Sequence, residues 1–151
     1  MYPDAVPSNS APISEFAEEV RIDQAFVGSC ANGKIEDLRI AAEIVRGRRV
    51  APGVRFIVTP GSQQVYLQAA KEGLIETLTE AGAVVTNSTC GACFGYHMGV
   101  LAPGEVCITA STRNFKGRMG SADAKVYMGA PATVAASALA GVITDPRTLS
   151  R

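Results

Sequence analysis

The sequence has no tryptophan and only one histidine, His97, among its 151 residues. Any general acid–base chemistry must therefore use other side chains, or groups that come from elsewhere. The 14 basic and 14 acidic residues give a net charge of zero, and no basic run extends beyond residues 46–49. Because nucleic-acid-binding proteins carry a basic patch or stripe, we expect no nucleic-acid partner.

Long apolar runs are also missing. Residues 1–10 have neither the basic start nor the apolar core of a signal peptide. The longest weakly polar stretch, residues 129–143, is shorter than the ~20 residues that a membrane span needs. These absences predict a cytoplasmic protein without a membrane partner. In that setting we expect the four cysteines to be thiols or ligands and not a disulfide framework.

The apolar content is sufficient for one folded domain, since 47% of the residues are hydrophobic and 19% are charged. Pro3, Pro7 and Pro12 punctuate the beginning of the chain, with serine and asparagine between them. We therefore predict an extended linker or arm over residues 1–19 and a single domain over residues 20–151.

Strand and helix patterns alternate through this domain. The hydrophobic periodicity and the turn residues predict strands at 20–29, 54–59, 83–86, 105–110 and 125–128, and helices at 34–47, 62–72, 74–82 and 131–141. Asn32 or Gly33 is expected to cap the first helix, and Ser62 the second. The alternation predicts a three-layer α/β fold, with a mostly parallel sheet and helices on both faces.

Three cysteines follow predicted strands directly. Cys30 comes after the first strand, and Cys90 and Cys93 come after the third. Because the carboxyl ends of parallel strands share one edge, we expect the three thiols and the loop 111–118 to converge there. Cys107 lies inside a predicted strand and is expected to be a small core residue.

The Cys-x-x-Cys pattern alone leaves several chemistries open. It is compatible with a redox disulfide, with half of a zinc site, or with part of an iron–sulfur cluster. His97 could complete a zinc site with Cys30, Cys90 and Cys93. Inert thiols in a plain α/β domain are the remaining possibility.

The loop at residues 111–118 carries two arginines, Arg113 and Arg118. Guanidinium forks on a glycine-containing loop are suited to carboxylate binding. Solvated surface arginines are the alternative interpretation.

Five motifs occur in order along the chain: residues 28–39 (Gly-Ser-Cys-x-Asn-Gly-Lys-Ile-Glu-Asp-Leu-Arg), 51–55 (Ala-Pro-Gly-Val-Arg), 60–65 (Pro-Gly-Ser-Gln-Gln-Val), 90–95 (Cys-Gly-x-Cys-x-Gly) and 113–120 (Arg-Asn-Phe-x-Gly-Arg-Met-Gly). Together they resemble the aconitase superfamily. Their order and spacing are similar to the third domain of the large subunits of 3-isopropylmalate dehydratase and homoaconitase. Residues 95–105 look most like the archaeal-type branch of these enzymes, which also includes dimethylmalate dehydratase.

The resemblance implies a [4Fe–4S] cluster ligated by Cys30, Cys90 and Cys93. It further implies that Arg113 and Arg118 bind substrate carboxylates and stabilise charge in the active site. Thr112 stands in a substrate-contacting position where relatives usually have asparagine, and Ala31 replaces the usual threonine after the first cysteine. These two departures concern contacts around the cluster and the substrate.

The resemblance also implies a larger enzyme. Family members have two earlier large-subunit domains and a small swivelling domain or subunit, and these would be the partners of this chain. Their reaction is the dehydration and rehydration of a hydroxy di- or tricarboxylate, which makes them hydro-lyases. We therefore expect this chain to be inactive alone.

Overall fold

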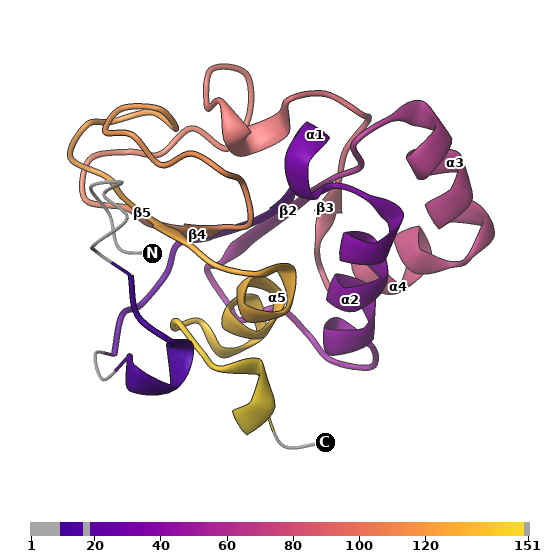
Figure 1. Cartoon of the computed structure of the whole chain (residues 1–151), viewed down its shortest axis with the longest axis horizontal. Coiled ribbons are helices and arrows are strands. Elements are labelled where there is room, and N and C mark those ends of the chain that lie inside the picture. Colours follow the sequence, from indigo (N-terminus) through magenta and orange to yellow (C-terminus); the bar gives the residue numbers. More distant parts are fainter. Residues whose placement is uncertain (1–9, 17–18, 150–151) are drawn as a thin grey trace.

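Five parallel strands form the centre of the molecule (Figure 1). The computed structural model describes residues 10–16 and 19–149. The strand order is β3-β2-β1-β4-β5, and each neighbouring pair is parallel. The strands are β1 (Gln24–Gly28), β2 (Arg55–Thr59), β3 (Val84–Val85), β4 (Val106–Thr109) and β5 (Lys125–Met128). The predicted α/β class is confirmed.

The helices follow the predicted order and are separated by the expected turns. They are α1 (Ser29–Asn32), α2 (Ile35–Val45), α3 (Gln63–Lys71), α4 (Leu74–Glu80) and α5 (Pro131–Ala140), together with the 3-10 helices η1 (Ile13–Glu15), η2 (Gly91–Cys93) and η3 (Pro146–Thr148). The cap at Ser62 is confirmed, since its hydroxyl accepts a hydrogen bond from the Val65 amide at 3.2 Å. Asn32 and Gly33 do not cap α2. The N-cap is Lys34, and its amide donates to the Asp37 carboxylate at 3.1 Å, because residues 29–32 already form α1.

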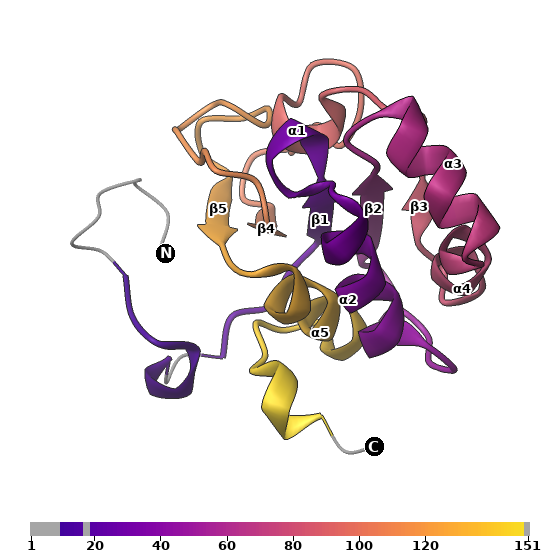
Figure 2. The ribbon, with the colours of Figure 1, turned by 45° about the vertical axis from the view of Figure 1, so that its right-hand side comes forward.

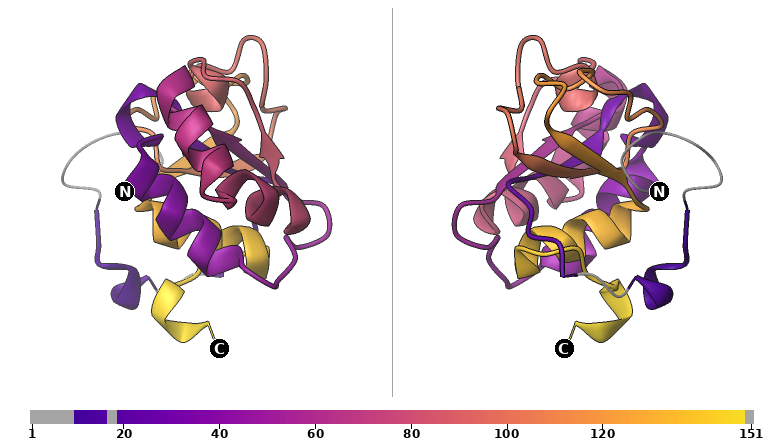
Figure 3. Two further views of the ribbon diagram at one scale, coloured as in Figure 1. Left: turned by 90° about the vertical axis from the view of Figure 1, so that its right-hand side faces the viewer. Right: turned by 90° about the vertical axis from the view of Figure 1, so that its left-hand side faces the viewer.

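The direction of each crossover decides which face of the sheet it covers. The connections after β1 and β2 carry helices and lead toward the β3 edge, whereas those after β3 and β4 lead toward the β5 edge. Because parallel crossovers are right-handed, the two sets of connections lie on opposite faces. Figures 1 and 3 show the helices gathered on one side of the sheet and the loops on the other. The layers are therefore helices, sheet, and a layer of loops that contains η2.

The helical face holds the main apolar core. Buried residues of α2, α4 and α5, such as Leu38, Leu78 and Val134, pack there against buried residues of the strands. The loop face has a smaller core, in which Ala92, Cys93, Leu101 and Met119 from the loops cover Phe26, Ile57, Cys107 and Val126 of the strands. Both faces of the sheet are thus buried, as an all-parallel sheet requires.

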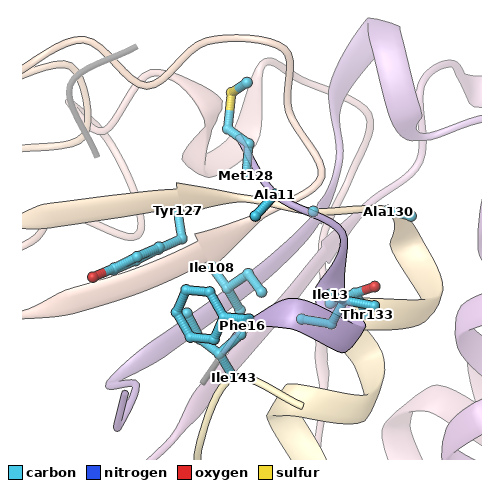
Figure 4. Close-up of a pocket in the computed structure, with 10 residues that line it drawn as sticks. Ala11, Ile13, Phe16, Ile108, Tyr127, Met128, Ala130, Thr133 and Ile143 are labelled. Carbon is cyan, nitrogen blue, oxygen red and sulfur yellow. The ribbon is translucent and has the colours of Figure 1, made fainter. Parts of the chain in front are cut away.

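The predicted arm lies partly outside the described residues, which omit 1–9 and 17–18 of it. In the described part, η1 leads to Phe16, whose ring meets Tyr127 edge-on with the centroids 6.1 Å apart. Figure 4 shows a pocket between this segment, β5 and the start of α5, lined mainly by apolar side chains such as Ile13, Ile108 and Ile143. Within residues 10–16 and 19–149, no helix is long and apolar enough to cross a membrane.

Candidate functional site

Cys30 comes directly after β1, and Cys93 lies near Ser29 and Ser111, which follow β1 and β4, the two strands between which the winding of the sheet reverses. The chain leaves β1 toward one edge and β4 toward the other. A crevice at such a switch point is the usual place for a ligand in an open α/β sheet. Figure 2 shows α1, which carries Cys30, at this end of the sheet close to η2, which ends at Cys93. The predicted convergence of the cysteine loops is therefore seen in the fold.

A tight turn places Cys30. Ser29 has a φ of 68°, a left-handed backbone that serine rarely adopts, and its side chain is buried. Strain of this kind clusters at functional sites, where the surrounding structure holds it in place. The side-chain amide of Asn32 donates to the Ala110 carbonyl just after β4, which ties the Cys30 turn to the end of that strand.

A second turn places Cys90 and Cys93. The Gly91 amide donates to Thr89 Oγ1 at 2.8 Å, and the Cys93 amide donates to the Cys90 carbonyl at 3.2 Å. Gly91 has a φ of 57° and lies directly against Thr59 of β2, where a side chain would not fit. The turn is thus held by local hydrogen bonds and by close backbone contact with the sheet.

The three thiols differ in exposure and in charge environment. Cys30 and Cys90 are exposed, and Cys93 is buried. Burial raises the pKa of Cys90, and the nearby Cys93 raises it further. Burial acts to raise the pKa of Cys93, but the hydrogen bond and the charge of Arg118, together with further hydrogen bonds, bring the pKa of Cys93 below its ordinary value. The hydroxyls of Ser29 and Ser111 act in the same direction. The surroundings of Cys93 therefore favour its thiolate form more than those of Cys90 do.

Arg118 lies beside Cys93. Its Nη2 donates to the Cys93 sulfur at 3.6 Å, and its guanidinium carbon lies 5.5 Å from the centroid of the Phe94 ring. Its Nε is buried and finds no hydrogen-bond partner among the described residues. A buried donor without a partner is costly, so this nitrogen is a natural contact for an anionic ligand.

The other candidate residues differ in exposure. Arg113 and Thr112 are both exposed, and the Arg113 guanidinium makes no ion pair with any residue that the structure describes. His97 is also exposed, with its Nε2 3.5 Å from Thr89 Oγ1. Cys107 is fully buried in β4, as expected, and burial raises its pKa to about 12.

Cys30, Cys90 and Cys93 are the residues of this site that could hold a metal group. Within the described ranges, no three side chains of histidine, cysteine, aspartate or glutamate are placed to hold one metal ion. The predicted zinc site at Cys30, Cys90, Cys93 and His97 is therefore not preformed. Three soft thiol ligands, and a buried arginine nitrogen without a hydrogen-bond partner among the described residues, are compatible with an anionic iron–sulfur cluster.

Two residues of the site were not anticipated from the sequence. Ser29 lies buried between a strand-ending glycine and Cys30, and its hydroxyl favours the Cys93 thiolate. Phe94 packs over Arg118 and stacks on Tyr96 with the ring centroids 4.5 Å apart. The Gly-Ser pair at the end of a strand was the available signal for Ser29. The contact between Phe94 and Arg118 joins two loops that are far apart in sequence, and no sequence pattern indicates it.

Comparisons with known proteins agree on one family. A family model described as the aconitase family (aconitate hydratase) matches residues 7–141. The 3-isopropylmalate dehydratase large subunit of Mycolicibacterium smegmatis is 67% identical over 145 residues, which are 96% of this chain and 34% of that protein. The homoaconitase large subunit of Thermus thermophilus is 57% identical over 129 residues, which are 85% of this chain and 31% of that protein. The chain thus spans about a third of the length of these relatives.

Proposed function

Because the chain belongs to the aconitase family, we propose that it is the cluster-ligating part of a hydro-lyase of the 3-isopropylmalate dehydratase and homoaconitase type. The observation that carries the proposal is the meeting of Cys30 with Cys90 and Cys93 at the switch point of the sheet, beside Arg118. The high identity to large subunits bearing these names supports the same assignment.

Cys30, Cys90 and Cys93 would hold a [4Fe–4S] cluster through three of its irons. When bound, the cluster supplies a Lewis-acidic iron that assists departure of a hydroxyl group from the substrate. Cys93 is the best prepared ligand, because Arg118 stabilises its thiolate form. The exposed Cys30 and Cys90 would supply the other two ligands from two separate loops.

The two arginines would bind and orient the substrate. Arg118 lies beside Cys93, and its buried Nε would donate to a carboxylate oxygen of the substrate. The exposed guanidinium of Arg113 offers a bidentate fork to a second carboxylate. Thr112, beside Arg113, adds a hydroxyl. Two cationic forks on one loop fit a hydroxy di- or tricarboxylate.

The site is one wall of a larger active site in this proposal. The chain spans about a third of its relatives, and its single histidine is exposed. The proton acceptor for a dehydration would therefore come from the remaining large-subunit domains or from a small subunit. The isolated chain is expected to give no turnover with 3-isopropylmalate or homocitrate, and turnover by the purified chain would contradict this.

Anaerobic reconstitution with iron and sulfide tests the cluster assignment. The wild-type chain should develop a broad absorption near ~400 nm, and Cys30→Ser should lose it. Cys107→Ser is the matched control, because Cys107 is buried in β4 and should not affect the band. Stoichiometric zinc binding without the band would instead favour a zinc module, and an unchanged band in Cys30→Ser would overturn the ligand set.

A further inference from the structure

We propose that Thr59, at the end of β2, positions the Cys30 turn and the Cys90–Cys93 turn relative to each other. Thr59 is fully buried and contacts no ligand site itself, but both cysteine turns rest on it. The inference deepens the proposed function, since it concerns the spacing of the three thiols that would hold the cluster.

The backbone of Thr59 supports the Cys30 turn. Gly28 pairs with Thr59 in the β1–β2 register, and a Cβ at Gly28 would lie 2.4 Å from the Thr59 carbonyl oxygen. A Cβ at Gly33, on the far side of Cys30, would lie 2.5 Å from the same oxygen. The Gly61 amide donates to the Gly33 carbonyl at 2.7 Å. The two glycines that flank Cys30 are thus seated on one peptide group.

The side chain of Thr59 supports the second turn. A Cβ at Gly91, between Cys90 and Cys93, would lie 2.5 Å from Thr59 Oγ1. The glycine at this position lets the backbone of the turn rest directly on the hydroxyl. A longer side chain at position 59 would push the Cys90–Cys93 turn away from the sheet.

The same hydroxyl also holds the segment that leads into Cys90. Thr59 Oγ1 lies 2.7 Å from Thr86 Oγ1, and the Thr86 hydroxyl donates to the Asn87 carbonyl at 3.1 Å. Because one hydroxyl has a single proton, Thr59 is then the donor to Thr86. This chain of two hydroxyls joins β2 to Asn87, three residues before Cys90. Thr59 therefore touches one cysteine turn with its backbone and the other with its hydroxyl.

Thr59→Val and Thr59→Ser separate the hydroxyl from the shape. Thr59→Val keeps the volume and removes the donor, whereas Thr59→Ser keeps the donor. The first measurement uses the apo-chain, in which the yield of a short bis-maleimide cross-link from Cys30 to Cys90 or Cys93 is followed by mass spectrometry. We expect the yield to fall about fivefold in Thr59→Val, the effect of one lost hydrogen bond, and to stay within about twofold in Thr59→Ser.

The second measurement is the rate at which the reconstituted cluster is lost to an iron chelator. Thr59→Val should lose it about five- to tenfold faster, and Thr59→Ser should again restore the wild-type behaviour. Thr86→Val removes the other hydroxyl of the same hydrogen-bonded pair, at a half-buried position, and should have the same effect as Thr59→Val. The proposal can therefore be tested even if Thr59→Val does not fold. Ser137→Ala is the control, because it removes a fully buried hydroxyl of α5 that bonds only within the helical layer and its C-terminal turn.

The proposal is overturned if Thr59→Val and Thr86→Val match the wild type in cross-linking, or if Thr59→Ser is impaired as much as Thr59→Val. An equal loss in Ser137→Ala would also overturn it, because the effect would then reflect stability alone. If the wild-type chain takes up no cluster, the proposed function fails, and the cross-link yields of the apo-chain still decide the role of Thr59.

Discussion

The two faces of the sheet are built in different ways. The helical face is covered by α2, α4 and α5, whose backbones satisfy their own hydrogen bonds and which bury apolar side chains. The loop face is covered by residues 86–105 and 110–124, whose backbones depend on contacts between segments. Gly95 donates to the Arg118 carbonyl at 3.1 Å, and Leu101 donates to the Met119 carbonyl at 2.7 Å.

The difference separates stability from chemistry. Most of the apolar core lies on the helical face, whereas Cys93, Arg118 and the exposed aromatic rings of Phe94 and Tyr96 lie on the loop face. The loop layer thus carries the buried Arg118 Nε that has no partner among the described residues, whereas the helical layer carries most of the buried apolar side chains. Substitutions on the two faces should therefore have different consequences.

The largest contrast is expected among the thiols themselves. Burial raises the pKa of Cys107 to about 12, whereas Cys30 and Cys90 are exposed. At pH 8 the thiolate fraction of Cys107 is lower than that of an ordinary cysteine by roughly three orders of magnitude. Iodoacetamide labelling followed by mass spectrometry should modify Cys30 and Cys90 in the native chain and Cys107 only after denaturation. Equal labelling rates for Cys30 and Cys107 would show that the loop layer does not shield Cys107 from the reagent.

Leu38→Ala tests the helical face. Leu38 is 1% exposed in α2, so its truncation should lower the free energy of unfolding by about 2–5 kcal/mol in urea denaturation. Leu67→Ala, at an exposed position of α3, is the control and should change it by less than about 0.5 kcal/mol. Native labelling of Cys30 and Cys90 should be the same in both variants. Faster labelling in Leu38→Ala alone would mean that the two faces are not independent.

Gly91→Ala and Gly104→Ala form a matched pair on the loop side. Both glycines have positive φ, but a Cβ at Gly104 meets nothing within 4 Å, whereas one at Gly91 meets Thr59. Gly104→Ala should cost about 1–2 kcal/mol from the backbone alone. Gly91→Ala should cost about 1–3 kcal/mol more and should speed the labelling of the buried Cys93. Equal costs in the two variants would show that the Cys90–Cys93 turn is not tightly seated.

The sequence predicts the scaffold better than it predicts this site. Periodicity and turn residues locate all five strands and the helices from α2 to α5, because regular elements bury a regular pattern of side chains. The predicted strand at 20–29 is longer than β1, and the cap of α2 is displaced because α1 occupies residues 29–32. The family resemblance is confirmed by the matching family model.

The contacts within the site could not be predicted, because they join loops that are far apart in sequence. The cation–π contact of Arg118 with Phe94 and the seat of Gly91 on Thr59 depend on how two irregular segments pack. No periodic pattern encodes such contacts. The predicted three-layer α/β class is confirmed, and in the described residues the layer on the loop face consists of η2 and loops, since the segments after β3 and β4 are rich in glycine.

The smallest expected effect is a pH dependence at the opposite end of the sheet. A hydrogen-bonded ion pair with Arg55, at 2.8 Å, lowers the pKa of Glu105. Arg55 also donates to Gln24, which donates to the Gly99 carbonyl of the loop layer. Because the folded-state pKa is depressed, this stabilisation is present above the unfolded-state value of about 4.3 and is lost as the pH falls through the folded-state value.

Glu105→Gln should therefore flatten the acid limb of the stability profile between about pH 5 and pH 3, by less than about 1 kcal/mol, because Arg55 is partly exposed to solvent. Urea denaturation at several pH values measures the change. Arg55→Met should have the same effect, and an unchanged acid limb in both variants would remove the ion pair from the account.

Native mass spectrometry of the anaerobically reconstituted chain tests the central claim most directly, namely that Cys30, Cys90 and Cys93 together hold a [4Fe–4S] cluster. The wild-type chain should gain the mass of one four-iron, four-sulfide cluster, and Cys30→Ser, Cys90→Ser and Cys93→Ser should each fail to retain it, while Cys107→Ser gains it as the wild type does. A single zinc ion on the wild-type chain, or an intact cluster on Cys30→Ser, would contradict the account.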